Sequence, residues 1–552
     1  MPKTAFIQVI LPLRLEWEPW YSLEDAAVGD RVSVSLAGRA YTGVVSAVDV
    51  VPDPSVKVLP ATRLDLPPVQ EKEIAFWRAL ASYYLCTVGE VYKAAYPEII
   101  RKGKEREPAR QPAEEPLPIA LPEYGEETLE QIQAAFSRKK TVLLSGNANK
   151  TELYLELARR CMQGGRSVLW LVPEIGLSRQ LETRIRASFP ALLVYHSGRT
   201  VARRKDVVSA VRGPEPCLVL GTRSALFLPH RQLGLIVVDQ EHDVSYKQDA
   251  PTPRYHARES AILLAGVHGA SVLLGSGTPS LESLYNAETG LFEKVEVNEH
   301  FSRGKAPQFT LINTAAEIRK NGMAGSFSLK LLDALHRALD AGQPALVICR
   351  SKDAIEECEA ELARIFPGKD IRTATPASFK TLATGTFACI GILKADGLLG
   401  KDDFRSDEHT LQFLQQLQAR CRAGGELVVQ TMEAGHPVFK AFREGLDARA
   451  FLPERQVAGY PPYTRLVQVV LRDRNPKRLD YLARELAAAL PRNLQAMGPY
   501  APELDAQQRL IRITLPRDKS LRSRKTALAA AVSAFEKTRK YTGHIALDVD
   551  PL

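Results

Sequence analysis

The stretch TVLLSGNANKTELYLELARRCMQGGRSVLWLVP, residues 141 to 173, decides the fold of the central part of the chain. It begins with an apolar strand, continues through a helical run from Glu152 to Met162, and closes with a second apolar strand. Further apolar strands follow at ALLVYHS, CLVLGT, LGLIVVD and SVLLGS, and helical stretches separate them. This alternation predicts a parallel sheet covered by helices on both faces, with ligands bound at the carboxyl ends of the strands.

Polar residues follow the strands of this predicted sheet and indicate a nucleotide-driven motor. They stand at Gly146-Lys150-Thr151, Pro173-Glu174, His196-Ser197, Gly221-Thr222-Arg223, Asp239 to His242 and Gly275 to Thr278. The first has the Lys-Thr pair of a phosphate-binding loop, but three residues separate Gly146 from Lys150, fewer than in G-x-x-x-x-G-K-[ST]. Two alternatives stay open. The loop binds nucleotide weakly, with the Lys150 ammonium contacting a phosphate and the Thr151 hydroxyl contacting Mg²⁺, or it is a turn between strand and helix with a purely structural role.

Composition narrows the class of protein. The 552 residues are enough for about three or four compact domains. No apolar run approaches the about 18 residues that span a membrane, so we expect no membrane contact. The seven cysteines form no C-x-x-C pair, so we expect neither zinc nor disulfides and place the protein in the cytoplasm. The net charge of +9 suits a phosphate-rich partner.

The chain outside the central part divides into recognisable segments. Short alternating apolar runs between Phe6 and Val50 predict a small β domain, and one helical stretch, EIAFWRALASYYLCTVGEVYKAAY, follows it. The segment from Arg101 to Pro118 is charged and rich in proline, which predicts an extended linker. Basic residues cluster between Lys519 and Lys525 and again between Lys537 and Lys540; such clusters indicate either phosphate contacts or solvated helix faces.

Several motifs together resemble one family. VPEIGLS (172–178), HSG (196–198), GTRSALF (221–227), VDQEHDVSYKQ (238–248), RYHARESA (254–261) and GSGTPSLES (275–283) resemble the first motor lobe of the primosomal protein N′ family of replication-restart DNA helicases. ILPLRLE (10–16) resembles its N-terminal domain, which holds the 3′ end of a nascent strand. GYPPY (459–463) and DVDPL (548–552) resemble its C-terminal domain.

The resemblance implies an α/β protein with superfamily-two helicase-like lobes. The expected parts are an N-terminal 3′-end-binding domain (1–100), a linker (101–118), a first lobe (119–312), a reduced second lobe (313–440) and a C-terminal α+β domain (441–552). Only the linker and a short segment stand where the family has a winged-helix domain. The sequence from Ala345 to Gly368 resembles the two flanks of the family's zinc module, joined directly, so no structural zinc is expected.

Further departures from the family concern catalysis. Gln240 stands in Asp239-Gln240-Glu241-His242 where the family has the glutamate that activates water, and an amide is not a base. Asp239 and Glu241 remain as remnants of the motif. Arg420 also remains, whereas Ala423 replaces a second phosphate-facing arginine. Together with the shortened loop at Gly146, Lys150 and Thr151, these changes predict that the two lobes do not hydrolyse ATP. Binding of ATP and Mg²⁺ is left open. No cofactor is expected to be required.

The candidate DNA contacts are better preserved. The aromatic and basic side chains that single-strand binding favours are Arg223, Tyr246, Lys247, Arg254, Tyr255 and His256. The alternative is that these residues stabilise the lobe internally. Trp17, Trp20 and Tyr21 of the N-terminal domain either stack on a base or belong to the core.

The sequence therefore predicts a DNA-binding replication-restart protein without helicase activity. We expect it to recognise branched, 3′-ended or single-stranded DNA, and we expect other primosome proteins and the single-strand binding protein as partners. An active ATP-dependent 3′-to-5′ helicase and a primosome scaffold that does not bind DNA are the alternatives.

Overall fold

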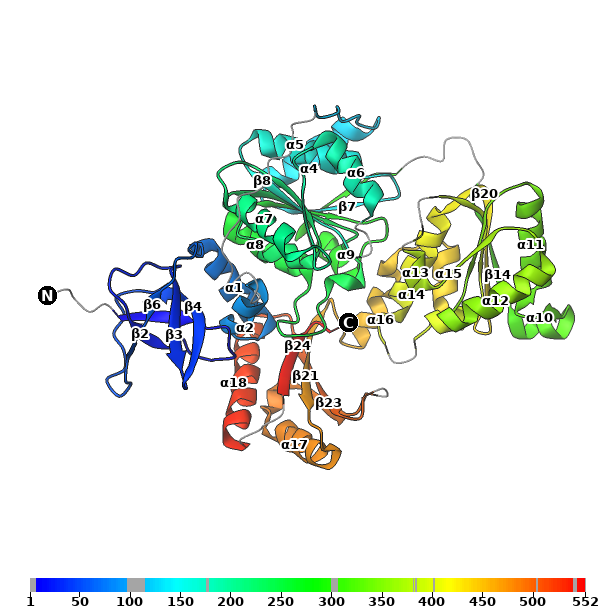
Figure 1. The fold of residues 1–552 in the computed structure, drawn as a ribbon. Coiled ribbons are helices and arrows are strands. Elements are labelled where there is room, and N and C mark those ends of the chain that lie inside the picture. Colours follow the sequence, from blue (N-terminus) through cyan, green and yellow to red (C-terminus); the bar gives the residue numbers. More distant parts are fainter. Residues whose placement is uncertain are drawn as a thin grey trace.

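The computed structural model describes residues 6–96, 115–174, 178–298, 306–380, 382, 385–400, 403–502, 505–539 and 544–551. Most of the predicted linker, residues 101–118, lies outside these ranges. The described residues form four large sheets and one two-stranded hairpin. Figure 1 shows the N-terminal sheet on one side, the first parallel sheet above, the second parallel sheet on the other side, and the C-terminal sheet below.

The N-terminal unit is a small, mostly antiparallel sheet followed by two helices. Its strands, in spatial order, are β5 (Leu59–Pro60), β2 (Trp20–Ser22), β1 (Phe6–Ile10), β4 (Arg39–Ala47), β3 (Arg31–Leu36) and β6 (Thr62–Arg63). The expected single helical stretch is two helices, α1 (Glu71–Tyr84) and α2 (Val88–Ala95). The break occurs because Leu85 adopts a left-handed conformation and Thr87 begins α2 with a capping box.

The first lobe is built on a seven-stranded sheet in which every pair of neighbouring strands is parallel. Its strands, in spatial order, are β13 (Phe292–Glu296), β7 (Thr141–Ser145), β12 (Ser271–Gly275), β11 (Leu233–Asp239), β8 (Ser167–Leu171), β10 (Leu218–Gly221) and β9 (Leu193–Tyr195). Its helices are α4 (Gly125–Ser137), α5 (Thr151–Gln163), α6 (Arg179–Ser188), α7 (Val201–Arg212), α8 (Ala257–His268) and α9 (Leu281–Glu288). The predicted parallel α/β class is confirmed; the edge strand β13 was not foreseen.

The second lobe carries a five-stranded parallel sheet. Its strands are β14 (Gln308–Asn313), β20 (Cys421–Thr431), β19 (Phe387–Ile392), β17 (Ala345–Ile348) and β18 (Ile371–Ala374). Its helices are α10 (Thr314–Lys320), α11 (Leu329–Asp340), α12 (Lys352–Ile365), α13 (Pro376–Phe379), α14 (Ser406–Ala419) and α15 (Pro437–Arg443), and β15 (Met323–Ala324) pairs with β16 (Phe327–Ser328). The expected lobe boundary at residue 312 falls inside β14, which pairs with β20.

The C-terminal unit is an antiparallel sheet with two long helices. Its strands are β22 (Ala496–Tyr500), β23 (Gln508–Pro516), β21 (Thr464–Arg472) and β24 (His544–Val549). Its helices are α17 (Pro476–Ala489) and α18 (Leu521–Arg539), and the short helix α16 (Leu452–Val457) leads into it. Figure 1 shows this unit directly below the first lobe, with α18 beside the N-terminal unit.

The largest hydrophobic cluster joins three of these units. It includes Trp77 of α1, Leu264 of α8 and Val549 of β24, all nearly inaccessible to solvent. The other face of the first sheet, the two faces of the second sheet and the interior of the N-terminal sheet have clusters of their own. Burial of apolar surface therefore holds the N-terminal unit, the first lobe and the C-terminal unit together.

Candidate nucleotide site and nucleic-acid interface

The loop between β7 and α5 is folded onto its own lobe. The Asn147 amide donates to Oδ1 of Asn298 at 3.1 Å, and the Ala148 amide donates to the Val297 carbonyl at 3.2 Å. Gly146 has φ of +101°, and a Cβ there would lie 2.1 Å from the Val297 carbonyl oxygen, so only glycine fits. A phosphate loop works because its amides point inward around the phosphate. Here the Val297 carbonyl and the Asn298 side chain, which follow β13, accept hydrogen bonds from two of those amides.

Lys150 is turned toward the same loop. Its ammonium donates to the carbonyl oxygens of Gly146 at 2.6 Å and Ala148 at 3.1 Å, and the residue is 9% exposed. Asn149 accepts from the amide of Thr151 at 3.0 Å, so its side chain satisfies the first amide of α5. In this arrangement Lys150 closes the turn and does not reach into open space above it.

Asp239, the first predicted remnant of the catalytic motif, stands at the end of β11. Its Oδ1 lies 3.4 Å from the Tyr154 hydroxyl and accepts from the Gln240 amide at 3.0 Å. Burial raises the pKa of Asp239 to about 6, against the opposing effects of the Lys150 charge and these hydrogen bonds. Gln240 is exposed with φ of +50°, and its amide group cannot accept a proton from water at neutral pH.

Glu241, the other predicted remnant, is fully buried and bound by structural donors. It accepts from the amide of Ser280 at 2.7 Å, from the hydroxyls of Ser280 and Ser283, each at 2.9 Å, and from Arg258 at 2.8 Å. The Arg258 guanidinium also lies 2.6 Å from Glu259. This carboxylate therefore connects α8 and α9 to the end of β11.

The two lobes meet through direct hydrogen bonds at the carboxyl end of the first sheet. Lys380 lies 2.6 Å from Asp243, and Gln416 of α14 lies 3.0 Å from Nε2 of His242. Burial lowers the pKa of His242 to about 4, so its ring is neutral at pH 7. Further contacts between the lobes join Glu408 to the Leu281 amide at 2.8 Å, Gln412 to the Pro279 carbonyl at 3.1 Å and Arg405 to Glu282 at 3.0 Å.

The predicted catalytic remnant Arg420 lies on the second lobe. Its Nε donates to the Gly385 carbonyl at 2.7 Å, and its guanidinium stands 5.5 Å from the centre of the Phe379 ring. Burial lowers its pKa, with a further contribution from Arg372. Gly385 and Phe379 belong to the second lobe, so these two contacts tie Arg420 to its own lobe.

The residues predicted to contact DNA hold the C-terminal strand against the first lobe. Lys247 donates to the Val549 carbonyl at 2.7 Å and lies 2.7 Å from Asp548, and Arg254 lies 3.0 Å from Asp548. Tyr246 donates to the Asp239 carbonyl at 2.6 Å, and both Tyr246 and Tyr255 are buried in the core. This geometry favours the alternative interpretation, internal stabilisation; contact with DNA by these side chains stays a prediction.

The two remaining candidates also have partners within the chain. Arg223 donates to the carbonyls of Ser245 and Lys247, each at 2.9 Å. His256 begins α8, accepts from the Arg258 amide at 3.2 Å, and lies 3.1 Å from Glu259. The six predicted side chains are thus grouped around the turn after β11, where they make contacts within the chain.

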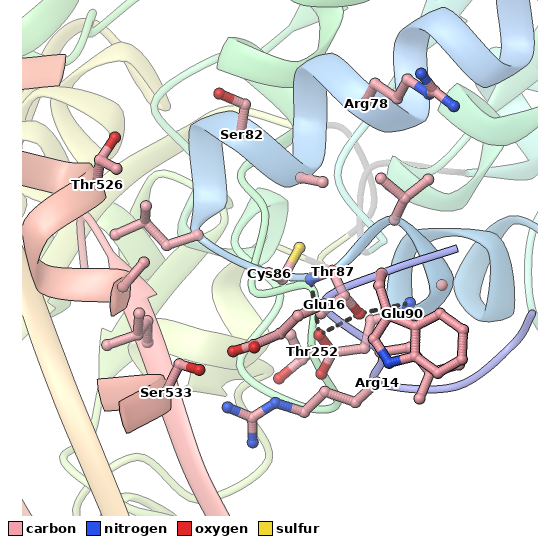
Figure 2. A pocket seen from close by; sticks show the side chains of 18 of the residues that line it. Arg14, Glu16, Arg78, Ser82, Cys86, Thr87, Glu90, Thr252, Thr526 and Ser533 are labelled. Atoms are coloured by element: carbon pink, nitrogen blue, oxygen red, sulfur yellow. Dashed lines mark hydrogen bonds between the residues drawn. The ribbon is translucent and has the colours of Figure 1, made fainter. Parts of the chain in front are cut away.

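A separate cavity of about 1110 Å³ lies between the N-terminal unit and α18, and we call it the α18 cavity. Trp17 and Trp20 line it with ring centres 6.2 Å apart, and Trp17 is 50% exposed. Tyr21, by contrast, belongs to the core of the β unit. Figure 2 looks into the cavity, with Ser533 of α18 on the side of Arg14 and Glu16, and Thr526 of α18 nearer to Ser82 of α1.

Basic side chains line the α18 cavity near the start of α18. Lys519 and Arg522 are exposed, whereas Lys525 donates to the Ser82 and Tyr83 carbonyls at the end of α1. Burial lowers the pKa of Lys525 to about 8, as does the charge of Arg465. Sequence reasoning found the basic cluster and the tryptophans separately, but nothing in the sequence placed them on one cavity.

The described residues contain neither a candidate metal site nor a helix that could span a membrane. Among them, no three His, Cys, Asp or Glu side chains are grouped so that they could hold a metal ion. No described helix is both long enough and apolar enough to cross a membrane.

Two parallel α/β lobes that meet at the carboxyl end of the first sheet, flanked by a β unit and an antiparallel unit, define a helicase-like two-lobe protein. Residues 8–97 match the 3′DNA-binding domain of the PriA family, and residues 456–552 match the Primosomal protein N C-terminal domain. Both matched domains are those of the PriA family of replication restart proteins, and this is the family that the chain resembles.

The chain is similar to curated members of this family across most of its length. It is 26% identical to replication restart protein PriA of Bacillus subtilis over 530 residues, which cover 76% of this chain and 66% of that protein. It is 25% identical to PriA of Rickettsia felis, with 86% of this chain and 87% of that protein covered. Among solved structures, RecG bound to a three-way DNA junction gives a TM-score of 0.40 at 15% identity, covering 59% of this chain and 45% of RecG.

Proposed function

We propose that this protein acts in replication restart as a DNA-binding factor whose lobes do not hydrolyse ATP. The observation that carries this proposal is the loop after β7, where Val297 and Asn298 accept from the loop amides and Lys150 donates to loop carbonyls. A nucleotide would have to displace these bonds before its phosphates could meet the Asn147 and Ala148 amides or the Lys150 ammonium. Gln240 would still leave the attacking water without a base.

The direct contacts between the lobes support the same proposal. In helicase-like motors, nucleotide bound between two lobes controls their closure. Here Lys380, Glu408, Gln412 and Gln416 bind the first lobe through direct side-chain contacts. We infer that the lobe pair acts as a fixed frame for the N-terminal and C-terminal units.

We propose that the α18 cavity receives DNA. The region that matches a 3′DNA-binding domain contributes Trp17 and Trp20, the turn before α18 contributes Lys519, and α18 contributes Arg522. An exposed indole supplies a stacking surface for a base, and the basic side chains neutralise phosphates, which is the combination that single-strand binding uses. A branched substrate with a free 3′ end presents both a base and a backbone to this cavity.

The purified chain is expected to show no DNA-stimulated ATP hydrolysis. Its turnover with forked DNA should equal that of Lys150→Ala, because the shortened loop and Gln240 are independent defects. Restoring the base by Gln240→Glu should therefore leave turnover unchanged. The measurement is phosphate release, with an active PriA relative as positive control; DNA-dependent release that Lys150→Ala abolishes would show that the lobes are a working motor.

Purified protein is also expected to contain less than stoichiometric zinc. The segment from Ala345 to Gly368 forms β17, α12 and the turn after it, with no cysteine pair at the spacing that zinc sites use. Elemental analysis after dialysis against a chelator measures the content. One or two zinc ions retained per chain would contradict this expectation.

A second candidate function is a scaffold that does not bind DNA. The observation that favours it is the internal pairing of Lys247 and Arg254 with Asp548, which removes two of the predicted DNA contacts. DNA-binding measurements on the full chain separate this candidate from the proposed function.

A further inference from the structure

A second cavity, of about 1150 Å³, lies at the carboxyl end of the second sheet, and we call it the second-lobe groove. It is lined by residues that follow β14, β17, β19 and β20, and by α16 and the turn after it. Its volume exceeds the about 300 to 1,000 Å³ that is usual for small-molecule pockets. The groove is therefore large enough for a segment of another chain.

The groove combines apolar side chains with a fixed aromatic wall. Met432 and Ile318 are 64% and 58% exposed, although both are large and apolar. Phe404 stacks on Tyr460 with ring centres 4.5 Å apart and an angle of 6° between the rings. The Arg455 guanidinium stands 4.5 Å from the Phe404 ring centre and lies 3.1 Å from the buried Glu408. The aromatic and charged side chains of this wall thus already have partners within the chain. The exposed side chains of Met432 and Ile318 are the apolar surface that a binding partner would cover.

The charges of the groove are predominantly acidic, on a chain whose net charge is +9. Its carboxylates are Asp396, Asp403, Asp407, Glu433 and Glu454, and its cations are Arg350, Lys394 and Arg455. Asp396 accepts from the Thr431 hydroxyl and the Met432 amide, whereas Glu433 and Glu454 are exposed. Carboxylates at this density repel a phosphate backbone and attract Lys or Arg side chains.

We propose that the second-lobe groove docks a segment of a protein partner that carries apolar side chains beside lysines or arginines. The apolar side chains would cover Met432 and Ile318, and the basic ones would meet Glu433 and Glu454. Nucleic acid is disfavoured, because the Phe404 ring already stacks on Tyr460 and on Arg455 and the surrounding charge is negative. This proposal does not depend on whether the lobes hydrolyse ATP or on how the α18 cavity binds DNA.

The test uses a phage-displayed library of random short peptides selected on the full chain. The library is counter-selected on the double variant Glu433→Lys/Glu454→Lys, whose changed side chains are exposed and so leave the fold intact. Enriched peptides are then synthesised with a fluorophore, and their affinity is measured by polarisation for the unchanged chain, the double variant, Met432→Asp and the control Glu444→Lys. Glu444 is an exposed acid at the end of α15 that does not line the groove.

The expected peptides contain Lys or Arg beside apolar residues. Their affinity should fall about tenfold or more in the double variant and in Met432→Asp, and should be unchanged in Glu444→Lys. Amide exchange should slow at residues 432–437 when peptide binds. The proposal is overturned if selection yields no peptide that distinguishes the chain from the double variant, if the enriched peptides are acidic, or if single-stranded DNA displaces them from the groove.

Discussion

Arg258→Ala is expected to destabilise the first lobe by about 3 to 5 kcal/mol, because it removes one partner of a buried ion pair. Glu241 has no exposed surface, and among the described residues its charged partner is Arg258, at 2.8 Å. Without the guanidinium, the carboxylate still accepts from the Ser280 and Ser283 donors but has lost that charged partner. Amide hydrogen exchange of β11 and β12 in the full chain measures the loss as a lower free energy of opening.

Two comparison variants make this result specific. Arg337→Ala removes an ion pair whose arginine side chain is 60% exposed, and it should cost no more than about 1 kcal/mol. Adding Glu241→Gln to Arg258→Ala should recover part of the loss, because a neutral amide leaves no buried charge. A loss for Arg258→Ala as small as that for Arg337→Ala would mean that the buried pair contributes little.

Affinity for single-stranded DNA is expected to fall steeply with salt and to be independent of ATP. The logarithmic slope is about −0.7 for each phosphate neutralised, so four contacts would lower affinity about 50-fold over a fourfold rise in salt. The double variant Lys519→Ala/Arg522→Ala should reduce the size of this slope by about 1.4. The measurement is a salt titration of binding to a single strand, a blunt duplex and a fork with a free 3′ end.

The aromatic part of the α18 cavity is tested in the same assay. Trp17→Ala should weaken binding to the 3′-ended fork by about 5-fold to 150-fold, since stacking on one base contributes about 1 to 3 kcal/mol. Lys440→Ala, at a 71% exposed lysine of the second lobe, is the matched control and should change nothing. Absence of binding to every DNA at low salt would favour the scaffold, and a marked ATP effect would favour the helicase.

Much of the fold was predictable from local patterns. The apolar runs that became β7, β8, β10, β11 and β12 alternate with amphipathic helices, and this periodicity reflects a sheet buried on both faces. The edge strand β13 was missed because three of the five residues in FEKVE are charged, so it lacks the continuous apolar run of the other strands. The single helix expected after the β unit became two, because a left-handed residue and a capping box are local features that helical periodicity does not show.

The sequence by itself determined which groups the candidate nucleotide site contains. The length of the loop after Gly146 and the amide of Gln240 are properties of the chain, since no fold turns an amide into a base. Only the tertiary structure decided which partners these groups have. Asn298 reaches the Asn147 amide and Asp548 pairs with Lys247 and Arg254, in each case from a distant part of the chain. Such pairs depend on which strands become neighbours, and local periodicity contains no information about that.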